Sequence, residues 1–405
     1  IFDGKGNKPF KADIAIQDGI IIEVGECKLD SKEKIIANNY IITPGFIDLH
    51  THYDGQISWD EELKPSVNHG VTTAILGNCG VGFAPCRESD RSKLINLMEG
   101  VEDIPGTALH EGITWEWETF PEYMNAIDAL PHTIDFAVMV PHDPLRVYVM
   151  GERAVSNEPA TKIDISQMKQ LTRDALEAGA IDFHKSSKGE WTPGSEAGKS
   201  ELIGIASAFR GLKHGVLQAV NDFDMLRPED NFDKEFDLMK DFFMAAPNHK
   251  GSISLMERDF APDDWRHIIK RTEEMNKNGS DIYFQVAPRA IGSFAGLDCT
   301  FHPLMAFPSY IAISDKTLSE RVAILRKTDF RDKLLAETPQ KLSGKNSSVP
   351  PMIDLIIENF EQIAEKQFKL NYEGYVDYEQ QPKNSIASLA RKNNFQGFSK
   401  KSLRK

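Results

Sequence analysis

From Gly45 onward the chain repeats one pattern, and this repetition limits the fold more than any other feature. Each repeat is an apolar strand followed by a loop and an amphipathic helix. Parallel strands joined by helical crossovers produce such a succession, because each strand must start from the same end of the sheet as the one before it. Seven stretches have the character of strands, at residues 46–52, 71–79, 134–142, 179–185, 215–222, 252–258 and 281–289.

The helices between these strands have clear apolar faces. Residues 164–180 place Ile165, Met168 and Leu171 on one side, with Asp164 as the expected N-cap and Gly179 just past the end. Residues 261–279 repeat the plan, and His267 lies near the polar face, where we expect a surface residue. Both apolar stripes are typical of core packing.

Seven strand–helix units with a small β module before them predict a (β/α)8 TIM-like barrel. The module is a hairpin over residues 12–24, because Asp18-Gly19 readily adopts the positive φ angles of a tight turn. An open, doubly wound sheet is the rival, but it usually carries a glycine-rich phosphate loop after its first strand. The sequence has no such loop at that place.

Composition and charge narrow the class of partner. The 405 residues carry a formal net charge of -14, which argues against nucleic acid or an anionic membrane and favours a small-molecule substrate. The sequence contains no long apolar run and no secretory pattern at its start, and its four cysteines are scattered. We therefore expect a cytoplasmic protein in a reducing compartment.

In a barrel, active residues follow the carboxyl ends of the strands. Here that rule selects polar residues at the strand ends, namely His50, His52, Cys79, His142, Asn221, Asp222, Arg258 and Arg289. His50 and His52 are two apart, so on a strand both can face the barrel axis and hold a divalent metal, most often zinc. The alternative is a pair of core histidines.

The other strand-end residues also allow two interpretations. Cys79, in "GNCG", is either a small buried hydrophobe or a zinc ligand. His142 and Arg146, in "VPHDPLR", and Arg289 are candidates for substrate binding, whereas the alternative for Arg146 is a surface arginine beside a capped loop. The aromatic and acidic stretch at residues 114–123 is either a lid or, as we favour, a packed loop.

Several blocks of sequence resemble the amidohydrolase superfamily, and within it the N-acyl-D-amino-acid deacylase (D-aminoacylase) branch. They are "ITPGFIDLHTHYDGQ", "GVTTAILGNCGVGFAP", "LMEGVEDIPGTAL", "GITWEWETFPEYM" and "VPHDPLRVYVMGERA". The resemblance runs from the N-terminal hairpin to about Ile386. It implies a β-sandwich beside a (β/α)8 barrel, with a zinc site that hydrolyses the amide bond of an N-acyl-D-amino acid.

The resemblance also implies roles for single residues. It makes His50 and His52 metal-site residues and Cys79 the metal-ligating cysteine, and it places His142 and Arg146 on a strand-end histidine and arginine of the family. The family's further metal histidines fall here on Val220 or Asn221 and on Leu255 or Met256. His184 and Lys185 are interpreted as loop residues, with Lys185 as a carbamylated metal bridge the remote alternative.

The eighth strand, which in the resembling enzymes carries the proton-shuttling aspartate, has no counterpart in this sequence, so the catalytic acid or base stays unknown. We expect an N-terminal β-sandwich part at residues 1–43, an incomplete barrel at 44–390 and a basic, disordered tail at 391–405. A barrel without one strand has two open edges. The expectation is therefore a fragment or truncated product with little activity.

Three functions compete. The first is a zinc-dependent hydrolase of linear amides, most of all N-acyl-D-amino acids. The second is a weakly active or inactive relative that serves as a binding or assembly subunit, and self-association is left open. The third is a cyclic-amide hydrolase, against which Cys79 argues, since such enzymes normally use a bridging lysine instead.

Overall fold

The structure is a computed structural model of the whole chain. The residues that it describes are 1–102, 104–185, 192–220, 232–257, 262–287, 292, 295–299, 301–343, 349, 351–370 and 380–392. The predicted site residues Asn221, Asp222, Arg258 and Arg289 lie outside these ranges, as does nearly all of the expected tail.

The N-terminal hairpin forms as predicted. Strands β1 (Asp13–Gln17) and β2 (Ile20–Gly25) pair antiparallel, and the turn between them has Asp18 at φ 52° and Gly19 at φ 76°. Positive φ angles at both central residues match the right-handed twist of the two strands. In this N-terminal region the described residues form a two-stranded sheet, so the complete β-sandwich stays a prediction.

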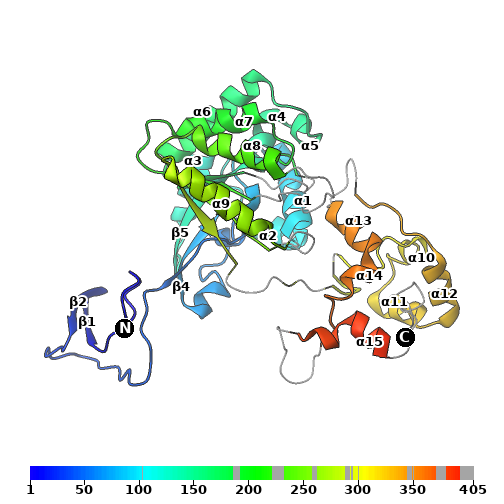
Figure 1. Cartoon of the computed structure of the whole chain (residues 1–405), viewed down its shortest axis with the longest axis horizontal. Coiled ribbons are helices and arrows are strands. Elements are labelled where there is room, and N and C mark those ends of the chain that lie inside the picture. The colour runs from blue at the N-terminus through cyan, green and yellow to red at the C-terminus, as the bar shows by residue number, and fades with distance from the viewer. Residues whose placement is uncertain are drawn as a thin grey trace.

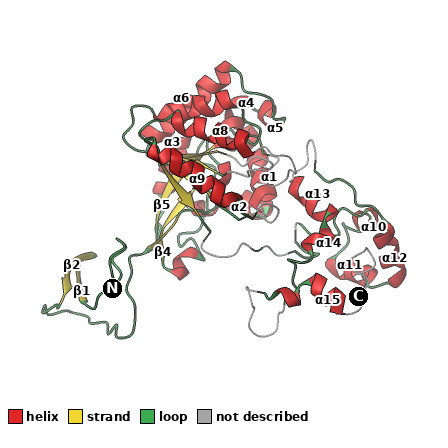
Figure 2. Ribbon diagram, viewed as in Figure 1, coloured by secondary structure: helices red, strands yellow, loops and turns green. Residues whose placement is uncertain are grey.

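A curled, all-parallel sheet forms the centre of the molecule (Figure 2). Over the residues that the structure describes it has seven strands in the order of the sequence: β3 (Phe46–Asp48), β4 (Val71–Leu76), β5 (Asp135–Pro141), β6 (Asp182–Lys185), β7 (Val216–Ala219), β8 (Lys250–Ser254) and β9 (Asp281–Gln285). Six of them lie inside predicted strands, whereas β8 begins two residues before the predicted range 252–258. The sequential order and parallel pairing are those of a TIM-like barrel.

Helices cover the outer side of this sheet (Figure 1). In this half of the chain they are α1 (Arg91–Glu102), α2 (Gly106–Gly112), α3 (Phe120–Asp128), α4 (His142–Met150), α5 (Glu152–Val155), α6 (Lys162–Glu177), α7 (Lys199–Ala206), α8 (Phe232–Met244) and α9 (Asp264–Lys277). Buried side chains of the strands and helices form one large core, in which Phe183 of β6 packs against Phe242 of α8.

The start of α6 corrects one prediction. Thr161, not Asp164, is the N-cap residue, and its hydroxyl accepts a hydrogen bond from the Asp164 amide at 3.2 Å. The Asp164 carboxylate accepts in return from the Thr161 amide at 2.7 Å. The two residues form a capping box, in which a threonine and an acidic residue three positions later satisfy each other's backbone donors. The surface position predicted for His267 on α9 is confirmed.

The C-terminal helices form a second hydrophobic core of their own. They gather apart from the sheet (Figure 1) and are α10 (Pro308–Ile311), α11 (Leu318–Leu325), α12 (Thr328–Ala336), α13 (Pro351–Glu358), α14 (Phe360–Ile363) and α15 (Ile386–Lys392). Phe307, Tyr310 and Leu334 are among the buried residues that make up this core. The predicted barrel segment 44–390 therefore contains two separately packed cores.

Two further observations concern membrane-spanning helices and the residues at the end of β6. Across the described ranges, no helix has both the length and the apolar character needed to cross a lipid bilayer. The prediction that His184 and Lys185 are loop residues is wrong, because both belong to β6 and both are buried. Residues 182–184 pair with β5 and residues 182–185 pair with β7, so the strand extends to Lys185.

Candidate metal centre

Three potential metal ligands meet beside the carboxyl ends of β3 and β4. One ligand atom from each of His50, His52 and Cys79 lies within 4.8 Å of the other two. The His50 Nε2 atom is 3.2 Å from the Cys79 sulfur, and the two imidazole centroids are 5.3 Å apart. His50 is exposed, whereas His52 and Cys79 are half-buried, so the cluster is open to solvent on one side.

The loop after β3 carries both histidines, and this corrects the expectation that they lie on the strand. Strand β3 ends at Asp48, whose carboxylate accepts a hydrogen bond from the His50 amide at 3.1 Å. Between the histidines, the Thr51 amide and hydroxyl both donate to the Ile75 carbonyl of β4, at 3.2 and 2.7 Å. These bonds hold the loop against β4 and direct both imidazoles to one place.

Cys79 is presented by a tight turn at the end of β4. Gly77 has φ 87°, and a Cβ atom there would lie 2.4 Å from the Met139 carbonyl oxygen, so glycine is required. Cys79 itself has φ 54°, a left-handed conformation that is unfavourable for a residue with a side chain. The buried Asn78 supports the turn, because its amide donates to the Thr51 and Ile75 carbonyls at 3.2 and 2.9 Å.

Glu102, the last residue of α1, brings a carboxylate to this cluster. Its Oε2 atom is 3.3 Å from His52 Nε2, and it also forms a hydrogen bond with Cys79. Sequence reasoning missed Glu102, because it lies about fifty residues from the histidines on a helix with no strand-end position. The signal was present in the block "LMEGVEDIPGTAL", which carried the family resemblance but suggested no chemistry.

Burial sets the protonation states of this region. It lowers the pKa of His52 to about 3, with a further contribution from His50, and it lowers the pKa of His50 as well. Burial raises the pKa of Glu102 to about 7 and that of Asp54 to about 8. Neutral imidazoles have free lone pairs at neutral pH, and that is the form in which histidine binds a metal.

The donor set fits a zinc ion. Two imidazoles that bind one zinc at about 2.0–2.1 Å in tetrahedral geometry have ring centroids roughly 5 Å apart, which agrees with the His50–His52 pair. A thiolate with two imidazoles is a set of ligands that binds zinc in preference to calcium or magnesium. Three protein ligands with an open side are typical of a catalytic site.

His142 and Arg146, predicted to bind substrate, form a buried network with Glu201 of α7. The Glu201 Oε1 atom accepts hydrogen bonds from His142 Nε2 at 3.0 Å and from Arg146 Nε at 2.9 Å. Arg146 is 1% exposed, and its other nitrogens donate to the carbonyl oxygens of Pro193 and Glu158. The alternative of a surface arginine is wrong, and the guanidinium faces protein groups in this arrangement.

The electrostatics of this network differ from those of the metal cluster. Burial would raise the pKa of Glu201, but the hydrogen bonds and charges of His142 and Arg146 lower it. Burial lowers the pKa of His142 in spite of the Glu201 carboxylate. The network therefore holds a carboxylate beside a guanidinium inside the protein. This is an arrangement that fixes α4 against α7.

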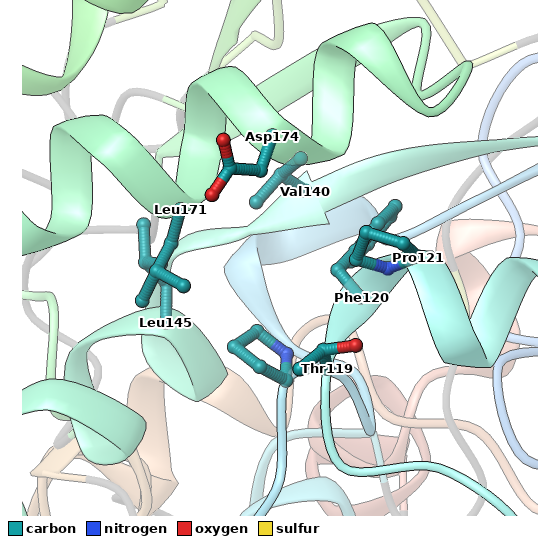
Figure 3. A pocket seen from close by; sticks show the side chains of 8 residues that line it. Thr119, Phe120, Pro121, Val140, Leu145, Leu171 and Asp174 are labelled. Carbon is teal, nitrogen blue, oxygen red and sulfur yellow. The ribbon is translucent and has the colours of Figure 1, made fainter.

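The aromatic segment after β4 packs onto the barrel, as the packed-loop interpretation predicts. Trp117 is 4% exposed, and its ring nitrogen donates to the Phe83 carbonyl at 2.8 Å. A small cavity of about 130 Å³ opens nearby, between α3, α4, α6 and β5 (Figure 3). Its lining is mainly apolar and contains none of the metal-cluster residues: Pro85, Thr119, Phe120, Pro121, Val140, Leu145, Leu171 and Asp174.

The sequential parallel sheet and the convergence of His50, His52 and Cys79 at its carboxyl edge are typical of a barrel protein with a metal site. The family profile of the amidohydrolase family matches residues 35–346. This match covers well over half of the chain. The protein therefore belongs to the amidohydrolase family, in its D-aminoacylase-like branch.

Individual relatives agree with this assignment. An uncharacterised protein of Mycobacterium tuberculosis is 38% identical over 187 residues, which cover 44% of this chain and 30% of that protein. The D-aminoacylase of Alcaligenes xylosoxydans xylosoxydans is 27% identical over 222 residues, 55% of this chain and 42% of that enzyme. The chain thus matches less than half the length of these curated relatives.

A solved structure shows the same fold. The N-acyl-D-glutamate deacylase of Bordetella bronchiseptica, in complex with zinc and a phosphonate inhibitor, superposes with a TM-score of 0.56 and 23% sequence identity. The superposition covers 71% of this chain and 56% of the deacylase. At that identity the likeness supports the architecture of the barrel and does not define a substrate.

Proposed function

We propose that this protein is a metal-dependent hydrolase of linear, non-peptide carbon–nitrogen bonds and that it deacylates N-acyl-D-amino acids. The observation that carries the proposal is the convergence of His50, His52 and Cys79 within 4.8 Å at the carboxyl edge of a parallel sheet. Active residues of such barrels lie at that edge. The substrate class follows from the deacylases among its relatives and structural neighbours.

His50, His52 and Cys79 would hold the metal, which we assign as zinc. A zinc ion in such a site lowers the pKa of a bound water toward neutrality and polarises a carbonyl group. Amide hydrolysis also needs a group that takes a proton from the water and delivers it to the leaving amine. We assign this proton transfer to the Glu102 carboxylate, because its Oε2 atom is 3.3 Å from His52 Nε2 and it also contacts Cys79.

The predicted substrate contacts divide into two groups. Arg289 stays a candidate for binding the substrate carboxylate, although it lies outside the described residues. Arg146 donates to Glu201 and to backbone carbonyls, and His142 Nε2 donates to Glu201, which favours a positioning role for both. In that role they keep the start of α4, and with it the carboxyl end of β5, in a fixed place.

The test combines metal analysis with enzyme assays on zinc-loaded protein. We expect hydrolysis of N-acyl-D-amino acids in preference to their L enantiomers. Glu102→Gln should lower kcat by about 100-fold or more, because general acid–base catalysis contributes on the order of 10²–10⁴-fold, and the variant should still bind zinc. The matched control is Glu99→Gln on the same helix. Full activity in Glu102→Gln would refute the assigned proton transfer.

A second candidate function, a non-catalytic binding or assembly subunit, is favoured by one observation. The residues that follow β7 and β8 are the buried, apolar Val220 and Leu255, which cannot bind a metal. A cyclic-amide hydrolase with Lys185 as a bridging ligand is disfavoured. Successive residues of β6 point to opposite faces, and His184 faces His50, so Lys185 is directed to the helices. Purified protein that binds no zinc would favour the binding subunit.

A further inference from the structure

Three amide side chains meet inside the curled sheet, where barrels of this kind usually hold aliphatic residues. They belong to Asn78 in the turn after β4, Gln218 in β7 and Gln285 at the end of β9. Asn78 is 0% and Gln218 2% exposed, and Gln285 is half-buried. Bulky branched residues dominate most barrel interiors. Buried amides cost free energy unless they are hydrogen-bonded, so their partners indicate their role.

The two glutamines pair through both ends of their amides. Gln285 Nε2 donates to Gln218 Oε1 at 2.9 Å, and Gln218 Nε2 donates to Gln285 Oε1 at 3.3 Å. Strand β8 lies between their strands in the sheet, so the pair spans that strand. Gln218 Nε2 also donates to Asn78 Oδ1 at 3.2 Å. Because β5 and β6 separate β4 from β7, this bond crosses the interior of the curled sheet.

Both ends of this chain of amides reach the metal cluster. At one end, Asn78 precedes Cys79, and its amide donates at 3.2 Å to the Thr51 carbonyl in the loop of the two histidines. At the other end, the Gln285 amide forms a hydrogen bond with the His50 imidazole. The amides therefore contact the segments that carry all three proposed metal ligands.

The two nitrogens of the His50 ring can serve different partners. Its Nε2 atom lies 3.2 Å from the Cys79 sulfur and so faces the cluster. A neutral imidazole has one N–H and one lone pair, and a metal binds the lone pair. The Gln285 oxygen has two lone pairs, of which Gln218 uses one. The other is available for the N–H of the imidazole.

We propose that Gln285 is a positioning residue of the metal centre, whose amide oxygen accepts a hydrogen bond from His50 Nδ1–H and leaves the Nε2 lone pair for the metal. Gln218 holds this amide in place. The inference rests on the proposed zinc site of His50, His52 and Cys79. Metal-bound histidines usually donate their second N–H to such an acceptor, which fixes the tautomer and the direction of the ring. The glutamines are not ligands, so the site keeps its open side.

A purely structural role is the alternative, because paired amides also stabilise the interior of a barrel. The two roles differ in what each glutamine contacts. Gln285→Leu and Gln218→Leu both remove the reciprocal amide pair, whereas only Gln285→Leu removes the contact with His50. Leucine has a similar volume and cannot accept a hydrogen bond. A comparison of the two variants therefore separates the roles.

The test measures zinc affinity by competition with a chromophoric chelator, and the tautomer of His50 in metal-free protein from the nitrogen chemical shifts of its ring. Gln285→Glu restores an acceptor oxygen at the same place and is the rescue variant. Gln170→Leu, a change of an exposed glutamine on α6, is the control. His50→Ala assigns the ring signals and reports on the metal site itself.

We expect the Nδ1–H tautomer of His50 in the unmodified protein. Gln285→Leu should lower the zinc affinity by roughly 10- to 100-fold, the usual cost of losing an outer-sphere partner, and should populate the other tautomer as well. Gln218→Leu should lose less affinity, because the contact with His50 remains. Gln285→Glu should stay close to the unmodified protein, and Gln170→Leu should not change.

The inference and the zinc site fail in different ways. Full zinc affinity in Gln285→Leu, equal losses in the two leucine variants, or the Nε2–H tautomer of His50 in unmodified protein that binds zinc would overturn the role of Gln285 alone. If Gln285→Leu does not fold, the tautomer in the unmodified protein still decides the matter. Unmodified protein that binds no zinc would overturn the metal site and the role of Gln285 together.

Discussion

The metal cluster and the His142–Arg146–Glu201 network contain similar residues but have different roles. Both combine imidazole with a carboxylate near the carboxyl edge of the sheet. In the network, Glu201 accepts hydrogen bonds from two side chains, and Arg146 donates to Glu201 and to two backbone carbonyls. In the described structure, His142 Nδ1 is the one atom of the three network side chains that is buried without a partner, whereas His52 Nδ1 in the cluster and Asp54 Oδ2 and His184 Nε2 near it all are.

This difference separates a structural site from a binding site. Protein groups already hold the Arg146 guanidinium and the Glu201 carboxylate, which leaves these two little capacity for a ligand, so the pair fixes α4 against α7. Buried donors and acceptors without partners, together with the left-handed backbone of Cys79, raise the free energy of the folded protein. A bound group that contacts them can lower it. Residue type alone would have given both sites the same function. The hydrogen-bond partners of the side chains distinguish the site that can bind a ligand from the one that stabilises the fold.

The largest expected effect tests the structural side of this comparison. Glu201→Ala leaves the Arg146 guanidinium buried without a counter-charge, which should lower the free energy of unfolding by about 3–5 kcal/mol. Urea denaturation followed by circular dichroism measures the change. The control is Glu158→Ala, because its side chain pairs with Arg153 at the surface, where an ion pair is worth about 1 kcal/mol or less. Equal effects of the two changes would show that the network is not structural.

The next effect tests the binding side. Cys79→Ala should weaken zinc binding by at least about 100-fold, because it removes a direct ligand and not merely an outer-sphere partner, and it should leave the unfolding of metal-free protein unchanged or slightly improved. Elemental analysis and a chelator titration measure the affinity. Cys86→Ala is the control, since burial raises the pKa of that thiol to about 12 and it lies outside the cluster. Tight zinc binding by Cys79→Ala would contradict the assigned ligand.

The smallest effect concerns an ion pair away from both sites. A hydrogen bond from Arg153 lowers the pKa of Asp164 to about 2 against the opposing effect of burial, and the capping box adds to this. Since the folded pKa lies below the unfolded one, the stabilisation is present above about pH 4 and is lost as the pH falls toward 2. Because Arg153 is partly exposed, the contribution is about 1 kcal/mol.

The measurement is a series of urea titrations between pH 7 and pH 2 on the unmodified protein and on Asp164→Asn. The two stability curves should differ at pH 7 and converge at the acid end. A constant difference at every pH would mean that the capping geometry, and not the charge, stabilises the start of α6.

Much of the fold was predictable because it is local. Apolar runs, helical stripes and turn dipeptides specify strands and helices from neighbouring residues, and all seven predicted strands overlap a strand of the described structure. The boundaries were less accurate. The strand with His50 ends at Asp48, and His184 and Lys185, which end the predicted stretch 179–185 but were interpreted as loop residues, belong to β6 because they pair with its neighbours.

The sequence by itself determined the succession of parallel strands, the spacing of His50 and His52 and the cysteine in its glycine-rich turn, since each depends on residues close together in the chain. Only the tertiary structure decided that Glu102 and His184 lie beside this cluster and that Arg146 is saturated. Those contacts join residues fifty or more positions apart. Strand order, register and helix packing create them, and no local pattern encodes that information.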